Sequence, residues 1–323
     1  MALNVTLFVV ASFIQACCWS VTRLPQAGES VAASAVSSEP GGKGFNVAIA
    51  ASRLGAQVSA LLGVGEDAAA DAALQLLQQH AITPVYAYRL ASQSGHGAGL
   101  IAADGANMIS VYLGPNQLIT ATHVDHAQAS IQSASLVYAQ FETSLAAIQH
   151  SFALARQAGR QTVLNPSPWQ PIPQAVLSQT AILIVNQHEA AQLLAWSAEL
   201  LAVSPEDTLI ALRQAMHAFY QQWPGDLLVV TLGALGSVAM TQAGEWVVAP
   251  AWPVTAVDTL GAGDAFSAGL CVALMHGEPL AQALAHANAC GACVVQTPGV
   301  LAALPDMLAV AAIQRQCGTT PLA

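Results

Sequence analysis

Charged side chains are scarce in this sequence, and lysine is almost absent. Asp, Glu, Lys and Arg together make up 8% of the 323 residues, and the formal net charge is −10. A nucleic acid partner requires basic patches that meet its phosphates, so we expect none. Lys43 is the single lysine of the chain. Because the sequence otherwise dispenses with lysine, one that persists inside a glycine-rich segment is a candidate functional residue.

Long apolar runs are also missing, although hydrophobic residues make up 54% of the chain. The longest candidate, residues 7–18, is interrupted by Ser12 and Gln15, and it falls short of the ~20 apolar residues that span a bilayer. No Lys or Arg precedes it, so the basic start of a secretory signal is missing. We therefore expect a cytoplasmic protein with no membrane partner. The surplus of Ala, Leu and Val favours a parallel sheet that is buried on both faces.

Cysteine is too sparse for a disulfide framework. Six cysteines in 323 residues fit a reducing compartment. Cys290 and Cys293 form a CxxC pair, but no second pair completes a tetrahedral zinc site. Two small apolar residues on one helix face are the favoured interpretation.

From about residue 130 onward, apolar runs alternate with amphipathic stretches. The runs that predict strands are residues 134–138, 161–164, 181–185 and 227–231, and those that predict helices are 145–158, 189–196 and 208–222. Such alternation is typical of βαβ units in an open, doubly wound, mainly parallel sheet. The length suits a single α/β domain over residues 1–323.

The first third of the chain has a different pattern. Residues 5–11 predict a central strand, whereas 31–37, 97–103 and 108–112 are short and alternating, with Asp104-Gly105 as a hairpin turn. We expect a small β-sheet lid from segments of about 19–39 and 95–116. A lid suits transfer chemistry because it excludes water. Its exposed sheet edges also suggest a homodimer through the lids.

The first glycine-rich segment precedes an expected helix at residues 47–54; it reads Pro40-Gly41-Gly42-Lys43-Gly44-Phe45-Asn46. Adjacent glycines let the backbone approach a ligand closely, and Lys43 and Asn46 add donors. A tight turn before a helix is the alternative interpretation. The segment is not a Walker A motif, because Gly44 stands where that motif has Ser or Thr.

The second glycine-rich segment opens a strongly apolar stretch; it reads Asp258-Thr259-Leu260-Gly261-Ala262-Gly263-Asp264-Ala265-Phe266-Ser267-Ala268-Gly269. The free N–H groups at the start of such a helix form an anion site. Asp264 falls in its first turn, where it either complements the helix dipole or accepts a proton from an attacking hydroxyl. An anion cradle beside a carboxylate favours the second interpretation.

Residues 41–54 and 258–269 resemble the two signature segments of the ribokinase-like (PfkB) carbohydrate kinase family. Further segments match in family order across nearly the whole chain: Leu24-Pro25-Gln26-Ala27-Gly28-Glu29 resembles its LPxPGE segment, Asn186-Gln187-His188-Glu189 its NxxE motif, and Thr231-Leu232-Gly233-Ala234-Leu235-Gly236 its TLGxxG nucleotide loop. The resemblance implies a ribokinase-like fold and an ATP-dependent sugar kinase.

The same resemblance assigns roles to residues on the sugar side. Asp264 is the expected general base, and Gly261, Ala262 and Gly263 form the anion hole. The residues expected to bind substrate are Gly41, Gly42, Lys43, Asn46, Glu142 and Asp258. Glu142 follows a predicted strand end, where ligands bind in open α/β sheets, although such a residue also suits a helix cap.

On the nucleotide side, the resemblance implies ATP and Mg²⁺, with K⁺ as a further cation. The residues expected near ATP are Asn186, Thr231, Gly233, Gly236 and Asn288, although a helix-surface asparagine is the favoured interpretation of the last. Glu189 would hold Mg²⁺ through water; Asn186 and Glu189 also have the spacing of a capping box, and the two interpretations are compatible. Asp258, with carbonyls near Leu260, Val294 and Gly299, would bind the monovalent cation.

One segment departs from the family pattern. The family carries an acid just after the first strand that holds two substrate hydroxyls, but residues 11–18 contain none, and the position near Ala16 is apolar. Ser12 or Gln15 would form weaker, neutral hydrogen bonds. The resemblance favours phosphorylation of a hydroxyl of a pentose-like sugar, but the missing acid means that the acceptor could differ from ribose. Three alternatives are left open: a kinase of a nucleoside or a hexose derivative, a non-catalytic sugar-binding or regulatory homologue, and a membrane-associated protein, which only the hydropathy suggests.

Overall fold

The computed structural model describes residues 5–104, 106–195 and 205–316. Within them, nine strands form one large sheet. Their order is β13 (Trp246–Ala249), β12 (Ser237–Thr241), β11 (Leu227–Thr231), β10 (Ile182–Asn186), β9 (Gln161–Asn165), β8 (Leu136–Gln140), β1 (Thr6–Val10), β4 (Gln57–Gly65) and β5 (Val85–Ala91). All neighbours from β5 to β11 are parallel, and β12 and β13 add two antiparallel pairings. The expected mainly parallel sheet is confirmed.

Helices cover both faces of this sheet, because the strands are apolar on both sides. In β1, Leu7 and Val9 belong to one core, while Phe8 and Val10 belong to the other. The first core includes side chains of α1 (Lys43–Arg53), α2 (Ala68–Gln79), α9 (Ala262–Met275), α10 (Leu280–Val294) and α11 (Met307–Gln316). The second includes α3 (Ala121–Asp125), α4 (Gln128–Ser133), α5 (Leu145–Gln157), α6 (Gln174–Leu177), α7 (Gln187–Leu193) and α8 (Pro205–Phe219). The fold is therefore a three-layer, doubly wound α/β structure.

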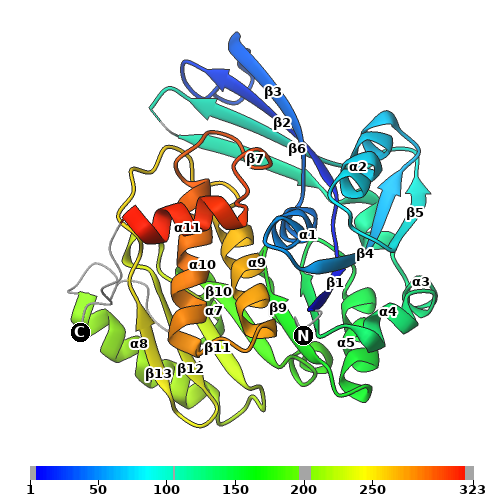
Figure 1. Cartoon of the computed structure of the whole chain (residues 1–323). Coiled ribbons are helices and arrows are strands. Elements are labelled where there is room, and N and C mark those ends of the chain that lie inside the picture. The colour runs from blue at the N-terminus through cyan, green and yellow to red at the C-terminus, as the bar shows by residue number, and fades with distance from the viewer. Residues whose placement is uncertain (1–4, 105, 196–204, 317–323) are drawn as a thin grey trace.

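A second, smaller sheet, which we call the lid after its expected role, lies apart from the large sheet, beyond α1 and α11 (Figure 1). Its strand order is β3 (Ala33–Gly41), β2 (Ile14–Val21), β6 (Gly95–Ala102) and β7 (Asn107–Tyr112). β6 and β7 pair antiparallel, as a hairpin requires, and the turn between them contains Asp104; the expected turn residue Gly105 lies outside the described residues.

The apolar run at residues 7–18 divides between the two sheets. β1 ends at Val10, the chain bends through residues 11–13, and β2 begins at Ile14, ahead of the first expected lid segment. Among the described residues, two 3-10 turns complete the element order, η1 (Gly114–Leu118) and η3 (Gly233–Leu235). The helix expected at 47–54 starts earlier, at Lys43, and Trp196, the expected end of another helix, lies outside the described residues.

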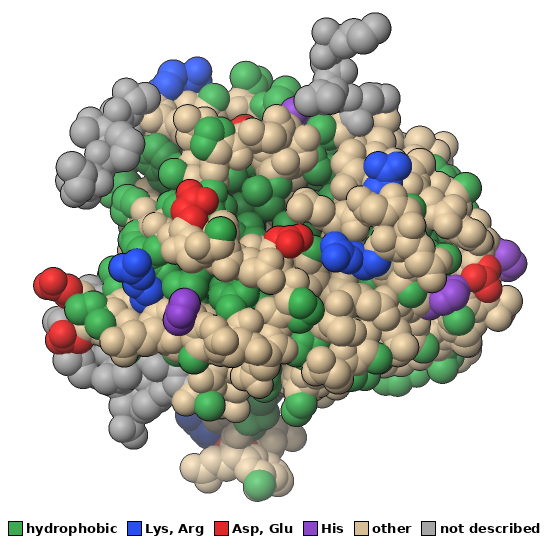
Figure 2. All heavy atoms as spheres, turned by 90° about the horizontal axis from the view of Figure 1, so that it is seen from below, with side chains coloured by type: hydrophobic (Ala, Val, Ile, Leu, Met, Phe, Trp, Pro, Cys, Tyr) green, Lys and Arg blue, Asp and Glu red, His purple; other side chains and the backbone are tan. Residues whose placement is uncertain are grey.

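Surface and helix properties agree with the composition. Charged side chains are sparse on the face shown in Figure 2. Most of this face consists of hydrophobic side chains, uncharged polar side chains and backbone. Across the described residues, no helix has the length and apolarity required to cross a membrane.

Candidate active site

The two glycine-rich segments lie together at the start of two packed helices. Lys43 and Asn46 are in the first turn of α1, and Asp264 is in the first turn of α9. The two helices run side by side beneath the lid (Figure 1). They start beyond the carboxyl ends of β1 and β8, the edge where open α/β sheets bind ligands.

Asp264 is held in place by Asn46. The side chain of Asn46 donates from Nδ2 to Asp264 Oδ2 at 2.8 Å, and Asp264 is only 6% exposed. Burial raises the pKa of Asp264, while Lys43 and the Asn46 hydrogen bond lower it; burial has the larger effect. Asn46 Oδ1 is buried and has no partner among the described residues. A buried acceptor of this kind is suited to a hydroxyl of a bound ligand.

The Glu142 carboxylate is fixed by two groups that come from distant parts of the chain. Its Oε2 accepts hydrogen bonds from Ser12 Oγ and from the backbone N–H of Lys43, both at 2.7 Å. Ser12 Oγ in turn accepts from Gly44 N at 3.2 Å. The carboxylate therefore ties the end of β8 to the start of α1. Sequence reasoning considered Ser12 only as a sugar ligand and missed this positioning role, because nothing local connects Ser12 to Glu142.

The ammonium group of Lys43 balances this acidic neighbourhood. Burial alone would lower the pKa of Lys43, but the charges of Asp264, Glu142 and Glu189 raise it. The pKa of Glu142 is raised by burial, against the lowering influence of Lys43. The charges of three carboxylates thus act on the lone lysine and hold its pKa above the ordinary value despite its burial.

The start of α9 forms an open cradle. Gly261 caps the helix in the left-handed region, with φ at 78°. The first N–H groups of an α-helix have no acceptor within the helix. Ala262 N donates to Thr259 O at 3.4 Å, which leaves the N–H groups of Gly263 and Asp264 available to an anion. A Cβ placed on Gly263 would meet nothing within 4 Å, so the space beside this backbone is free. The cradle therefore fits a phosphate group beside Asp264.

Gly42 and Gly44 allow close approach to the first strand. A Cβ on Gly42 would lie 2.6 Å from Ser12 O, and one on Gly44 would lie 2.6 Å from Ala11 Cα. Gly41, the last residue of β3, is buried where the lid joins α1. Close backbone packing accounts for Gly42 and Gly44, and it brings Lys43 and Asn46 to the site.

Asp258 connects the segment before α9 with the loop after α10. Its Oδ1 accepts from Leu260 N at 3.0 Å and its Oδ2 accepts from Gly299 N at 3.1 Å. Val294 is buried at the end of α10, and its carbonyl accepts from Thr297 N. Asp258 therefore has a structural role in the described residues, at the position where the monovalent cation was expected.

Asn186 and Glu189 form the capping box that their spacing indicates. Asn186 Oδ1 accepts from His188 N and Glu189 N, and Glu189 Oε2 accepts from Asn186 N, all at 2.9 Å. Glu189 is 5% exposed and its charge acts on Lys43. No cluster of three or more His, Cys, Asp or Glu suited to a metal occurs in the described residues. The Glu189 carboxylate accepts from Asn186 N through Oε2, and a carboxylate of this kind can hold Mg²⁺ through water.

The other residues expected near ATP lie at the end of β11, the strand next to β10, and on elements that follow it in the chain. Thr231 ends β11 in register with Asn186 of β10. Gly233 has a φ of 58° and open space where a Cβ would stand, and Gly236 has a φ of 97° with Ala249 O only 2.2 Å from its Cβ position. Asn288 is buried in α10 and donates to the carbonyls of Ala249 and Pro250. Its amide nitrogen therefore braces the loop after β13.

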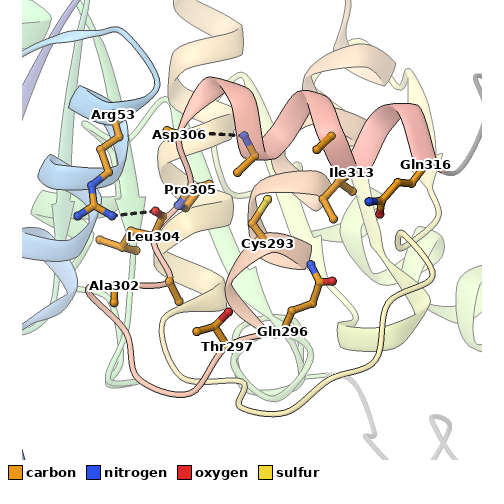
Figure 3. A pocket seen from close by; sticks show the side chains of 13 residues that line it. Arg53, Cys293, Gln296, Thr297, Ala302, Leu304, Pro305, Asp306, Ile313 and Gln316 are labelled. Carbon is orange, nitrogen blue, oxygen red and sulfur yellow. Dashed lines mark hydrogen bonds between the residues drawn. The ribbon is translucent and has the colours of Figure 1, made fainter.

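A cavity of about 740 Å³ lies elsewhere, under α11 (Figure 3). It contains none of the expected site residues; its lining includes Arg53, Cys293, Gln296, Asp306 and Ile313. Arg53 Nη1 donates to the carbonyls of Leu301 and Leu304. The cavity thus borders the back of the loop that carries Gly299.

Comparisons with known proteins agree with this arrangement. Residues 7–307 match the family model described as pfkB family carbohydrate kinase. The chain belongs to this family. It is therefore a carbohydrate kinase, a phosphotransferase with an alcohol group as acceptor, and the expected family resemblance is confirmed.

Individual members of the pfkB family show how far the likeness extends. The chain is 31% identical over 281 residues to ribokinase of Bacillus subtilis, covering 87% of this chain and 89% of that protein. It is 30% identical over 246 residues to deoxyribokinase of Salmonella typhi, covering 76% and 77%. A solved structure of Arabidopsis thaliana ribokinase complexed with ribose and ATP has a TM-score of 0.87 at 25% identity, covering 96% of this chain and 98% of that one.

Proposed function

We propose that this kinase transfers the γ-phosphoryl group of MgATP to a hydroxyl of a pentose-like sugar, with Asp264 as general base. One observation carries the proposal: a buried carboxylate, oriented by Asn46, stands in the first turn of a helix whose backbone cradle is open. The similarity to a ribokinase and a deoxyribokinase supports a pentose as acceptor.

In the proposed reaction, the sugar hydroxyl gives its proton to the Asp264 carboxylate as its oxygen bonds to the γ-phosphorus of ATP. The bond from the γ-phosphorus to the bridging oxygen breaks, and its electron pair leaves with ADP. N–H groups at the start of α9 donate to the oxygens of the transferring group. Asn46 Oδ1, Lys43 and Glu142 hold the sugar. When bound, Mg²⁺ neutralises phosphate charge, with Glu189 holding one of its waters.

The remaining assignments are proposals of the same kind. Thr231, Gly233 and Gly236 line the nucleotide side, with Asn186 nearby. A monovalent cation beside Asp258 would hold together two segments that this carboxylate already connects, the one before α9 and the loop at Gly299. A kcat that stays the same when K⁺ is replaced by a bulky organic cation would contradict that site.

The acceptor is tested by measuring ADP release with ribose, 2-deoxyribose, fructose derivatives, adenosine and inosine. Asp264→Asn should lower kcat by at least ~10² while sugar and ATP still bind, because only the proton acceptor is lost. Asp71→Asn is the matched control, since Asp71 also lies in a first helical turn but is exposed and paired with Arg89. Near-normal turnover of Asp264→Asn would remove Asp264 from its role. Binding of a sugar without turnover in the wild type would instead favour a sugar-binding homologue.

We also infer a homodimer through the lids. Val36, Trp19, Leu100 and Met108 are successive register partners across β3, β2, β6 and β7. Register partners point to the same face of a sheet, so the four form an apolar row. Val36 is 66% and Met108 is 55% exposed. A second copy of the lid would cover this row.

A further inference from the structure

Glu39 is an acidic residue of the lid that the sequence motifs do not include. It lies in β3 opposite Ala16 of β2, which in turn lies opposite Gly97 of β6. Partners in register share a face, so the carboxylate stands beside two small residues. Gln15 and Cys17 lie on the other face, where both contact Ser38. Glu39, Ala16 and Gly97 therefore form a row across one face of the lid, which we call the inner face, and Glu39 is the acidic member of this row.

The inner face of the lid meets the loop after α10 at this carboxylate. Glu39 Oε1 accepts a hydrogen bond from the backbone N–H of Val300 at 3.2 Å. A Cβ on Gly299 would lie 3.6 Å from Glu39 Oε2, so the carboxylate sits directly over this pair of residues. Gly299 N donates to Asp258. Two consecutive amides therefore bind two carboxylates, one from the lid and one from the segment that leads into α9.

The side chain of Val300 connects this attachment of the lid with the anion cradle. A Cβ on Gly261 would stand 2.5 Å from Val300 Cγ1, so the valine side chain packs against the residue that caps α9. At its far end the loop is anchored to α1, because Arg53 Nη1 donates to the carbonyl of Leu301 and to that of Leu304, the second bond being drawn in Figure 3. The loop is held from the lid, from α1 and from the start of α9.

On the lid side, the strand that carries Glu39 leads to the proposed sugar-binding residues. β3 ends at Gly41, and Gly42 alone separates it from Lys43, the first residue of α1. A displacement of Glu39 therefore moves the start of α1, where Lys43 and Asn46 lie. Glu39 stands between the two segments that face each other across the proposed reaction.

We propose that Glu39 is a positioning residue of the kinase: by holding the Val300 N–H, it fixes the lid and the start of α1 at the correct distance from the cradle of α9. The inference rests on the proposed phosphoryl transfer. With the lid fastened, the hydroxyl of the sugar is in place and water is excluded. Without the fastening, the phosphoryl group is also open to attack by water.

The test compares Glu39→Ala and Glu39→Gln with the wild type in kcat, KM and the ratio of ADP to sugar phosphate formed. Glu39→Ala should lower kcat by about tenfold or more through misplacement and raise the ratio above that of the wild type. Glu39→Gln should restore most of the activity and tight coupling, because its amide oxygen accepts the same N–H. Glu29→Ala is the matched control, a lid glutamate that accepts from the backbone N–H of Gln26 in its own turn.

A second measurement does not depend on turnover. Hydrogen exchange at residues 295–304 should be faster in Glu39→Ala than in the wild type and close to normal in Glu39→Gln. If Glu39→Ala matches an active wild type in kcat, coupling ratio and exchange, the role of Glu39 is overturned and the proposed kinase stands. If the wild type phosphorylates no acceptor in the panel, the proposed function fails, and this role fails with it.

Discussion

At the residue scale, the burial of Asp264 makes activity and stability change with pH in opposite directions. A general base must be ionised, and burial raises the pKa of this carboxyl above its ordinary value, so activity is lost on acidification at a higher pH than an exposed aspartate would give. The folded chain also keeps this proton to a higher pH than the unfolded chain does. Asp264 therefore reduces the free energy of unfolding as the pH rises through the raised pKa.

The charge of Lys43 limits the rise in the pKa of Asp264. Removal of this lysine therefore has a predictable effect. Lys43→Met should raise the pKa of Asp264, because the lysine charge lowers it. The acid limb of kcat/KM against pH should therefore move to higher pH, and sugar should bind more weakly than in the wild type while ATP binding changes less. The measurement is a pH–rate profile at several sugar concentrations.

Arg156→Met serves as the control for Lys43→Met, since Arg156 is an exposed cation in the last turn of α5. Its profile should follow that of the wild type. An acid limb that stays in place in Lys43→Met would show that the lysine charge does not act on the base.

The sequence predicts some residues of the site and not others. Asp264 and Lys43 lie in sequence motifs whose glycines mark the start of a helix, so their neighbourhood is predictable. The Ser12–Glu142 hydrogen bond joins residues 130 positions apart, and Glu39 meets Val300 across 261. No local pattern records such contacts, because the first depends on the pairing of β1 with β8 and the second on how the lid is placed against the large domain.

At the element scale, the site depends on where α1 and α9 begin. Both helices start directly after a glycine with positive φ, Gly42 at 104° and Gly261 at 78°. Glycine adopts this region without the strain that other residues incur, so it fixes the direction in which each helix leaves. The two starts are thereby brought together, as the Asn46–Asp264 hydrogen bond records.

Gly261→Ala tests the second of these starts. The new Cβ would be strained by roughly 1–2 kcal/mol in the left-handed region and would also clash with Val300 Cγ1, 2.5 Å away. We expect a lower stability in urea unfolding and a fall in kcat, because relief of the clash shifts the start of α9, with the cradle and Asp264, relative to the start of α1.

Gly159→Ala separates the strain from the clash. Gly159 has a φ of 71° with nothing within 4 Å of its Cβ position, so this variant should show the loss of stability alone. Equal losses of stability and no change of kcat in the two variants would mean that the contact with Val300 does not matter.

The sequence predicts the type of most elements better than their junctions. Alternation of apolar strands and helices from residue 130 onward indicates a buried parallel sheet, and the structure has it. The run at residues 7–18 is apolar apart from Ser12 and Gln15, yet it supplies β1 of one sheet and β2 of the other. Hydrophobicity alone does not mark the bend at residues 11–13, because both strands have buried faces.

At the scale of the whole molecule, the two faces of the lid serve different purposes. The inner face carries Glu39 toward the large domain, and the outer face carries the apolar row of Val36, Trp19, Leu100 and Met108. The row faces away from the site, so the protein folds without covering it. An exposed apolar surface of this kind is typical of an interface.

This row predicts the state of assembly. The wild type should have twice the 33.1 kDa mass of the chain in light scattering, and Val36→Asp with Met108→Asp should reduce it to a monomer, because paired lids would bury the new carboxylates without partners. Ile210→Asp is the control, since Ile210 is 53% exposed on α8, away from the lid. A monomeric wild type, or a dimer that survives both lid substitutions, would contradict the proposed interface. If the dimer also braces the lid, the monomeric variant should release more ADP per sugar phosphate, because the loosened lid admits water.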